Sequence, residues 1–271
     1  MITPQFFNSA FVPANRRFVQ AGARGEKLRL PVRWGLFEHP AAGWVMIDTG
    51  YTPAATQSAG RSLGLRAYSA ALRPQLLPDG QPDAVLARLG LAAADIAMVI
   101  VTHFHADHVS GLRDFPTARF LAVAAAARAV QMRGYLANMR QGVFGELLPP
   151  NFEARMMDTA GLATAERAGV RGGDIFGDGS VLAIPLAGHA DGHFGLLFAD
   201  LARPFLYGVD AAWVRAAILQ DAAPGYPARL ISHDHAAGLD SAQRLRAFAA
   251  AGGDLGLCHD PAPMPYDGAA R

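Results

Sequence analysis

Residues 98–111 read Met-Val-Ile-Val-Thr-His-Phe-His-Ala-Asp-His-Val-Ser-Gly, and they are the most informative part of the chain. Its apolar beginning, Met98–Val101, has the β-branched composition of a buried strand. Four side chains that can bind a metal ion follow it within six residues, namely His103, His105, Asp107 and His108. Imidazole and carboxylate donors suit Zn²⁺ and also Mn²⁺, Fe and Co²⁺. The stretch therefore predicts a metal site where a buried strand ends.

The spacing of these four donors indicates more than one ion. His103 and His105 are two residues apart, so in an extended segment they leave the backbone on the same side. Asp107 and His108 lie one turn further along the chain and can face a second ion beside the first. We therefore prefer a two-metal site to the alternative, an exposed polar loop.

Three other predicted strands are also followed by His or Asp. His189 follows the predicted strand Val181–Pro185, Asp210 follows Pro204–Val209, and His259 follows Asp254–Leu257. Gly188 and Gly192 flank His189 and allow a tight turn that directs its side chain inward. His193 ends the same turn and is expected to lie behind the metal ligands, without binding an ion itself. A site along one edge of a sheet requires this placement, so we expect the three residues to complete it.

The composition favours one globular domain over residues 1–271. The chain is 51% hydrophobic with a net charge of +1, and it is long enough for a substantial core. Its arginines are scattered, so no nucleic-acid partner is expected. No window approaches 18 uninterrupted apolar residues, so no membrane partner is expected either. Cys258 is the only cysteine, which excludes a disulfide framework. The N-terminus lacks the pattern of an export signal, so we expect a cytoplasmic location.

Strand and helix signals alternate along the chain. Besides the strands already named, we expect strands at Leu28–Glu38, Trp44–Asp48, Ala118–Val123 and Gly195–Phe198. We expect helices at Pro82–Leu89, Ala124–Met139 and Asp240–Ala251, and a long surface loop over residues 53–80. Strands predominate in both halves with helices between them. This favours an α/β fold in which two sheets pack face to face with helices outside.

The motifs resemble those of the metallo-β-lactamase superfamily over residues 48–260. The resemblance implies an αββα sandwich with two metals in a groove at one sheet edge. By the same resemblance, the first metal would bind His103, His105 and His189. The second would bind Asp107, His108 and His259, with Asp210 bridging the two. Asp48, in an Ile-Asp-Thr-Gly turn, matches a position behind the ligands where it would orient a histidine.

Within the superfamily, the chain is similar to the N-acyl-homoserine lactonase group and its many uncharacterised relatives. His105 stands where flavodiiron proteins carry Glu, and a bridging Asp210 argues against true β-lactamases. Neither a glutathione-type basic pocket nor an RNA-gripping surface can be recognised. Lactonases of this group place a tyrosine three residues after the bridging aspartate, where this chain has Trp213. An indole N–H donates a hydrogen bond but cannot accept one, so other esters and thioesters stay open as substrates.

These observations predict a dinuclear metal-dependent hydrolase of a small lactone or ester. The nucleophile would be a hydroxide that bridges two divalent ions, zinc by preference, with manganese, iron or cobalt as alternatives. Asp107 is the candidate catalytic residue, because it can orient the hydroxide and return a proton to the leaving group. The alternatives are a thioesterase or another acyl hydrolase of the same fold. An iron-dependent oxidoreductase of the persulfide dioxygenase type is less favoured, because the second-metal set is complete.

Residues 124–160 carry more apolar side chains than a linker needs, and they form a candidate helical cap over the site. The candidate pocket residues are Trp213, Phe144 and Tyr135. His233 and His235 rival His259 as the late ligand, although we assign them to a polar loop or pocket rim. Asp191 is expected to be a turn carboxylate that pairs with a neighbour. The expected partner is a small-molecule substrate, and a homodimer stays open.

Overall fold

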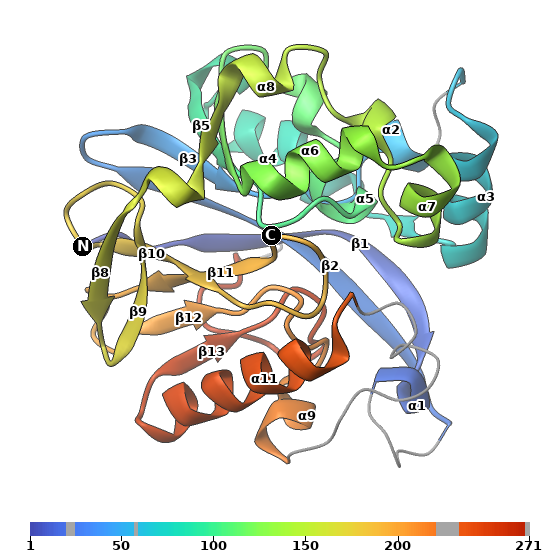
Figure 1. Ribbon diagram of the computed structural model, residues 1–271. Coiled ribbons are helices and arrows are strands. Elements are labelled where there is room, and N and C mark those ends of the chain that lie inside the picture. The colour runs from blue at the N-terminus through green and yellow to red at the C-terminus, as the bar shows by residue number, and fades with distance from the viewer. Residues whose placement is uncertain (20–24, 57–58, 221–232, 269–271) are drawn as a thin grey trace.

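Two β-sheets form the centre of the protein, as the computed structural model in Figure 1 shows. The structure describes residues 1–19, 25–56, 59–220 and 233–268. The first sheet has the order β4-β1-β2-β3-β5-β6-β7. Its strands are β1 Gln5–Asn15, β2 Lys27–His39, β3 Gly43–Ile47, β4 Gln75–Leu76, β5 Ile96–Ile100, β6 Arg119–Ala122 and β7 Met156–Asp158.

The second sheet has the order β13-β12-β11-β10-β9-β8. Its strands are β8 Ala163–Arg167, β9 Val170–Asp174, β10 Val181–Pro185, β11 Phe194–Phe198, β12 Phe205–Tyr207 and β13 Asp254–Gly256. Most neighbours in this sheet are antiparallel, but β12 and β13 are parallel. Because β10 and β12 both run opposite to β11, the carboxyl ends of β10, β12 and β13 share one edge.

The same arrangement of strand ends recurs in the first sheet. β1, β2 and β3 are antiparallel, whereas β3, β5, β6 and β7 are parallel neighbours. The carboxyl ends of β3 and β5 therefore lie side by side, and Asp48 N donates to Ile100 O at 2.9 Å. Each sheet thus presents several strand ends at one edge, as the sequence pattern predicted.

Helices cover the outer faces of both sheets, so the predicted layer order is confirmed (Figure 1). The helices are α1 Arg16–Val19, α2 Pro53–Thr56, α3 Leu63–Leu72, α4 Pro82–Arg88, α5 Ala106–Val109, α6 Ala124–Met132, α7 Tyr135–Arg140, α8 Phe152–Arg155, α9 Arg215–Leu219 and α11 His235–Ala250. One hydrophobic cluster between the sheets contains Trp34 and Phe37 from β2 together with Phe198 and Phe205 from the second sheet. No helix among the described residues has the length and apolarity needed to cross a bilayer.

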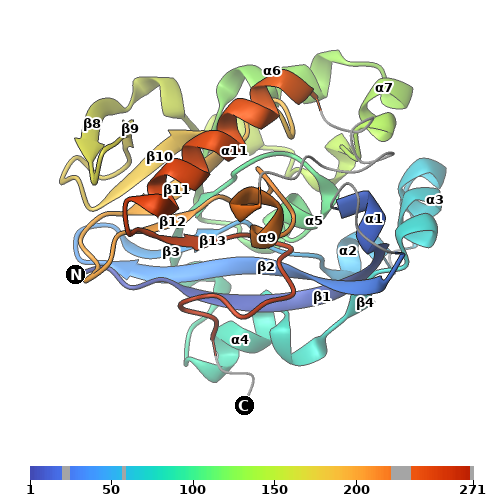
Figure 2. The ribbon, with the colours of Figure 1, turned by 90° about the horizontal axis from the view of Figure 1, so that it is seen from below.

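A second hydrophobic cluster lies between the outer face of the second sheet and helix α11. Figure 2 shows α11 lying across this sheet, with α9 beside its strands. Leu245 and Phe248 from α11 pack there with Leu206 of β12 and Leu255 of β13. Leu245 is fully buried. The helix therefore supports the strands whose ends carry Asp210 and His259.

Two expectations about local structure were wrong. Residues 53–80 are not a long loop, because they contain α2, α3 and β4. Helix α3 is capped at its start by Ser62, whose side chain accepts from Leu65 N, and it buries Leu65. The helix expected over Ala124–Met139 is divided into α6 and α7, because Arg133 has an extended backbone with ψ 141°. Strands β1, β4, β7, β8 and β9 were not predicted, and several of them alternate weakly between apolar and polar residues.

The packing of α11 generates a stability prediction. Leu245→Ala should lower the free energy of unfolding by about 2–5 kcal/mol, because it leaves a cavity under the helix. Leu239→Ala is the control on the same helix, where the side chain is 40% exposed; it should change stability by less than about 0.5 kcal/mol. Urea denaturation followed by circular dichroism measures both. Equal losses in the two variants would contradict this account of the packing.

Candidate metal centre

The strand ends of both sheets bring seven His and Asp side chains together. The first sheet supplies His103, His105, Asp107 and His108 after β5, and the second supplies His189 after β10, Asp210 after β12 and His259 after β13. Six of the seven fall into two groups of possible metal ligands, and Asp107 lies beside the second group. The structure therefore gathers all seven predicted ligands at one place between the sheets.

The turns that carry these side chains have unusual backbone geometry. Gly188 has φ +124°, and a Cβ atom there would lie 2.2 Å from Gly238 N, so only glycine fits before His189. Val209, directly before Asp210, has φ +53°. A left-handed conformation is strained for a β-branched residue and costs on the order of 1–3 kcal/mol. The surrounding fold therefore imposes the direction in which Asp210 leaves the strand.

The first donor group has the spacing of ligands around one cation. His105 Nδ1 lies 3.1 Å from His103 Nε2 and 3.0 Å from His189 Nε2. Asp210 Oδ2 lies 3.2 Å from His189 Nε2 and 3.8 Å from His103 Nε2. Tetrahedral ligands at the usual Zn–N distance lie roughly 3.3–3.4 Å from one another. This group could therefore hold one divalent ion with little movement.

The second donor group uses the same oxygen of Asp210. His259 Nε2 lies 3.1 Å from Asp210 Oδ2 and 3.4 Å from Asp107 Oδ2. His108 Nε2 lies 3.5 Å and 3.7 Å from these two oxygens, respectively. Cys258 Sγ is also within 4.8 Å of the donors of His108, Asp210 and His259. Because Asp210 Oδ2 belongs to both groups, its carboxylate is placed to bridge two ions.

Two buried atoms at this centre lack a hydrogen-bond partner within the described part of the chain and could instead contact a metal ion. His108 Nε2 and Asp210 Oδ1 are buried, and neither has a hydrogen-bond partner among the described residues. A buried polar atom without a partner is unfavourable by about 1–3 kcal/mol, and more for a charged group. A cation beside these atoms would remove that penalty. The donor set therefore fits a pair of divalent metal ions.

A second layer of hydrogen bonds fixes the ligand rings. His108 Nδ1 lies 2.8 Å from Asp48 Oδ2, and the Asp48 carboxylate also accepts from Thr102 N and Oγ1. His259 Nδ1 donates to Pro31 O at 2.8 Å. These bonds direct Nε2 of each ring toward the centre. Asp48 thus lies where the sequence analysis expected it, and His108 is the histidine it contacts.

His193 and Arg33 position ligands without belonging to either donor group. His193 Nδ1 donates to Leu186 O at 2.7 Å, and its Nε2 accepts from Asp210 N at 3.2 Å. Arg33, from β2, is buried and donates to the carbonyl oxygens of residues 257, 258 and 260. Those residues surround His259, so a side chain of the first sheet holds the loop that follows β13.

Burial and mutual contact set the charges of these groups. Burial lowers the pKa of His103 and His105 well below the usual histidine range, so both rings are neutral ligands. It also lowers the pKa of His193, to about 3. Burial acts to raise the pKa of Asp210, but the nearby His259 and His108 hold it well below its usual value. Asp210 therefore carries a charged carboxylate.

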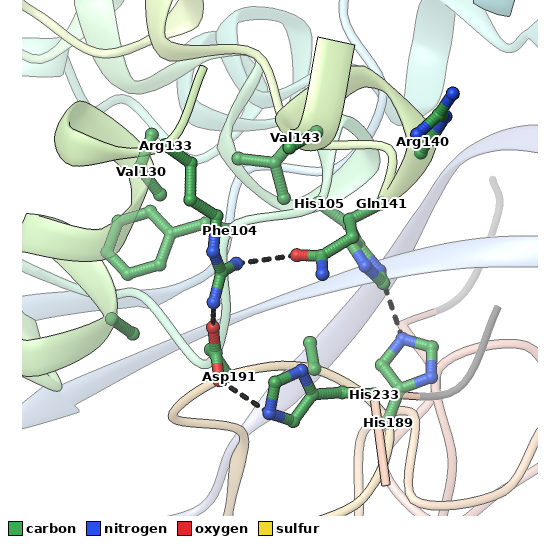
Figure 3. A pocket seen from close by; sticks show the side chains of 13 residues that line it. Phe104, His105, Val130, Arg133, Arg140, Gln141, Val143, His189, Asp191 and His233 are labelled. Atoms are coloured by element: carbon green, nitrogen blue, oxygen red, sulfur yellow. Dashed lines mark hydrogen bonds and ion pairs between the residues drawn. The ribbon is translucent and has the colours of Figure 1, made fainter. Parts of the chain in front are cut away.

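A cavity of about 340 Å³ opens beside the first donor group (Figure 3). His105 and His189 form part of its wall. The rest comes from α6, α7 and the residues beside these helices, from the segments that follow β5 and β10, and from His233 just before α11. The lining residues are Phe104, His105, Ala126, Val130, Arg133, Ala137, Arg140, Gln141, Val143, His189, Ala190, Asp191 and His233. A small molecule in this cavity would contact His105 and His189 of the first donor group directly.

The structure does not bring the candidate pocket residues Phe144 and Tyr135 into this cavity. Phe144 is buried in the main core, where its ring lies 5.2 Å from that of Tyr68. Tyr135 is 49% exposed, and its hydroxyl donates to Ser62 Oγ. Both residues were selected for apolar character alone, which does not distinguish a core side chain from a pocket side chain. Trp213 is half-buried, and its ring lies 6.4 Å from that of His259.

Several residues near the site were missed or underrated by the sequence analysis. Burial and then the charge of Asp107 raise the pKa of Tyr68, so its phenol stays protonated. Tyr68 lies on α3, within the segment expected to be a loop, and recognition of the Ser62 cap could have revealed it. Asp191 pairs with a neighbour as expected, but its partners are Arg133 and His233, which line the cavity. His235 begins α11 and belongs to neither donor group.

The comparisons with known proteins agree with this geometry. Residues 29–251 match the family model of the metallo-beta-lactamase superfamily. The chain belongs to this superfamily, and its fold is the metallo-β-lactamase fold.

Individual relatives share a substantial part of the chain. A protein named N-acyl homoserine lactonase AttM from Agrobacterium fabrum is 29% identical over 232 residues, which are 83% of this chain and 80% of that protein. A probable metallo-hydrolase from Mycobacterium bovis is 31% identical over 184 residues, or 65% of this chain. The match spans 55% of the length of that protein and of its counterpart from Mycobacterium tuberculosis.

Two solved structures show the same fold. The structure of a mutant of AiiA from B. thuringiensis, with N-decanoyl-L-homoserine bound at the active site, superposes with a TM-score of 0.71. It is 18% identical, and the superposition covers 95% of this chain and 93% of that one. AidC, described as a dizinc quorum-quenching lactonase, superposes with a TM-score of 0.66 at 13% identity, covering 97% and 89%.

The Asp48–His108 contact generates a prediction about metal affinity. Asp48→Asn should lower the affinity for the second ion by about 10–100-fold, because the ring of His108 loses the carboxylate that orients it. The control is Asp200→Asn, which removes an exposed carboxylate whose partner is Arg167. Competition with a chromophoric chelator measures both affinities. Two tightly bound ions in Asp48→Asn would contradict the assigned role.

Proposed function

We propose that this protein is a dinuclear metal-dependent hydrolase that opens a small lactone or cleaves a related ester. The single observation that carries the proposal is the shared Asp210 Oδ2, which lies within 3.8 Å of donors from both groups. Membership in the metallo-β-lactamase superfamily and the similarity to the lactonase AttM support this choice. The proposal treats residues 1–271 as one domain that acts on a small molecule.

The proposed ligands follow from the two donor groups. One ion is held by His103, His105 and His189, and the other by Asp107, His108 and His259, with Asp210 between them. When bound, two such ions lower the pKa of a shared water toward neutrality and polarise the substrate carbonyl. Zinc is the preferred ion because all seven donors are imidazole or carboxylate, although manganese, iron and cobalt accept the same donors.

Asp107 is the proposed catalytic residue among the carboxylates of the centre. Its side chain is 14% exposed, compared with 2% for Asp210 and 1% for Asp48. All three carboxylates contact histidines, but only the Asp107 side chain keeps appreciable exposure to solvent. Its carboxylate is therefore placed to receive a proton from the attacking water and to transfer it to the leaving oxygen.

The cavity beside His105 and His189 is the proposed substrate site. Residues 126–143 of the expected 124–160 cap line it, whereas Leu147, Leu148 and Phe152 of the same segment join the core. We propose that α6 and α7 form one wall of the site rather than a cap over it. The wall would hold the acyl group while the carbonyl lies at the metal centre.

A substrate screen tests the proposed function. Zinc-, manganese- and iron-loaded protein should hydrolyse members of a set of lactones, aryl esters and thioesters, and removal of metal by a chelator should abolish the activity. About two ions per chain are expected by elemental analysis. A single bound iron with no hydrolysis of any member of the set would refute the proposal.

The role of Asp107 generates a separate prediction. Asp107→Asn should lower kcat by about 100-fold or more, because proton transfer contributes roughly that much. The metal content should fall much less, since the second ion keeps three other ligands. Asp114→Asn, a nearby exposed carboxylate in the turn after α5, is the control and should leave both quantities unchanged. Parallel losses of metal and activity would mean that Asp107 acts only as a ligand.

A further inference from the structure

One wall of the cavity is a row of four connected polar side chains. Arg133 donates to Gln141 Oε1 at 2.6 Å and also to Asp191 (Figure 3). The second oxygen of Asp191 lies 2.8 Å from His233 Nε2. All four residues line the cavity, and the side chains of Arg133 and Asp191 are less than 30% exposed. The guanidinium of Arg133 is therefore held in place at the cavity surface.

The charges that line the cavity do not balance. Two arginines, Arg133 and Arg140, line it together with one carboxylate, Asp191. Within the part of the chain that the structure describes, Arg140 forms no ion pair, so one positive charge is left over. A guanidinium has five N–H donors, and the contacts of Arg133 use only part of them. The cavity can therefore attract and bind an anion.

The remaining lining is apolar and limits what kind of anion fits. Phe104, Val130 and Val143 line the same cavity as the arginines. A short methylene chain could contact these three side chains. A long alkyl chain would also have to cover the polar row. The polar side chains would then lose their contact with water, which is unfavourable in free energy. The lining therefore favours a short carbon chain that ends in a charged group.

We propose that the substrate of the hydrolase has a short acyl chain that ends in a carboxylate, which Arg133 binds. This inference rests on the proposed function, because it places the scissile carbonyl at the metal centre. The planar fork of the guanidinium matches a carboxylate geometrically, and Arg140 adds a second positive charge. Arg133 is thus a specificity-determining residue, and Asp191 and Gln141 position it.

Two esters that differ only in the terminal group test this proposal. The substrates are 4-nitrophenyl hemiglutarate, which ends in a carboxylate, and its neutral glutaramate analogue. The zinc-loaded protein should prefer the hemiglutarate by about tenfold in kcat/KM, mainly through KM. Arg133→Met should reduce this preference to about one, mainly by raising KM for the hemiglutarate. Arg128→Gln is the control, because this exposed arginine lies on α6 shortly before Arg133 and does not line the cavity.

Asp191→Asn separates anion binding from a purely structural role of the polar row. If Arg133 binds the substrate, loss of its counter-charge should keep or increase the preference for the hemiglutarate. If the row only joins α6 to the segment after β10, Asp191→Asn and Arg133→Met should lose activity equally on both esters. That equal loss, or a wild-type preference of one or less, would overturn the proposal.

If neither ester is hydrolysed, that result counts against the proposed function. A direct binding measurement then tests whether Arg133 binds a carboxylate. Isothermal titration of glutarate into the zinc-loaded protein should show saturable binding that is weakened at least about tenfold in Arg133→Met. Added salt should weaken it as well, because the attraction is electrostatic. No binding, or equal binding by the two proteins, would overturn the proposal.

Discussion

The rest of the site depends on the contacts between the buried Asp210 carboxylate and the histidines around it. Its Oδ2 atom lies within 3.2 Å of His189 and His259 and within 3.8 Å of His103 and His108. Four histidines from two sheets therefore surround one buried oxygen. Burial of that charge is tolerable only if cations or protonated rings surround it. The left-handed backbone at Val209 and the hydrogen bond from Asp210 N to His193 fix the direction of this carboxylate.

The site was more predictable from the sequence than the fold that surrounds it. His103, His105, Asp107 and His108 are adjacent in the chain, and the strand before them is strongly apolar, so local pattern was sufficient. Asp210 and His259 could be proposed because each follows a short apolar strand. The weaker strands were missed, since β8 is largely exposed, β9 is mostly half-buried, and the two are stabilised by pairing. Pairing partners far apart in the chain leave little trace in local composition.

The surroundings of the site could not be predicted, for a different reason. The roles of Arg33, Arg133 and Tyr68 depend on contacts between segments that are distant in sequence. Arg33 lies 224 or more residues from the carbonyl groups that it binds, and Arg133 lies 58 residues from Asp191. Phe144 illustrates the opposite case, because its apolar character suggested a pocket but the residue packs in the core. Side-chain chemistry identifies ligands, whereas the tertiary fold decides which neighbours they have.

The division of the donors between the two sheets has a consequence for the durability of the protein. The stretch after β5 belongs to one sheet, and His189, Asp210 and His259 belong to the other, so bound ions would cross-link the two halves of the sandwich. A chain with one cysteine has no disulfide that could do the same. Ions that bind only the folded chain raise its free energy of unfolding by mass action, and this stabilisation grows with the ion concentration. Resistance of this protein to heat and proteases would then follow the metal supply of its surroundings.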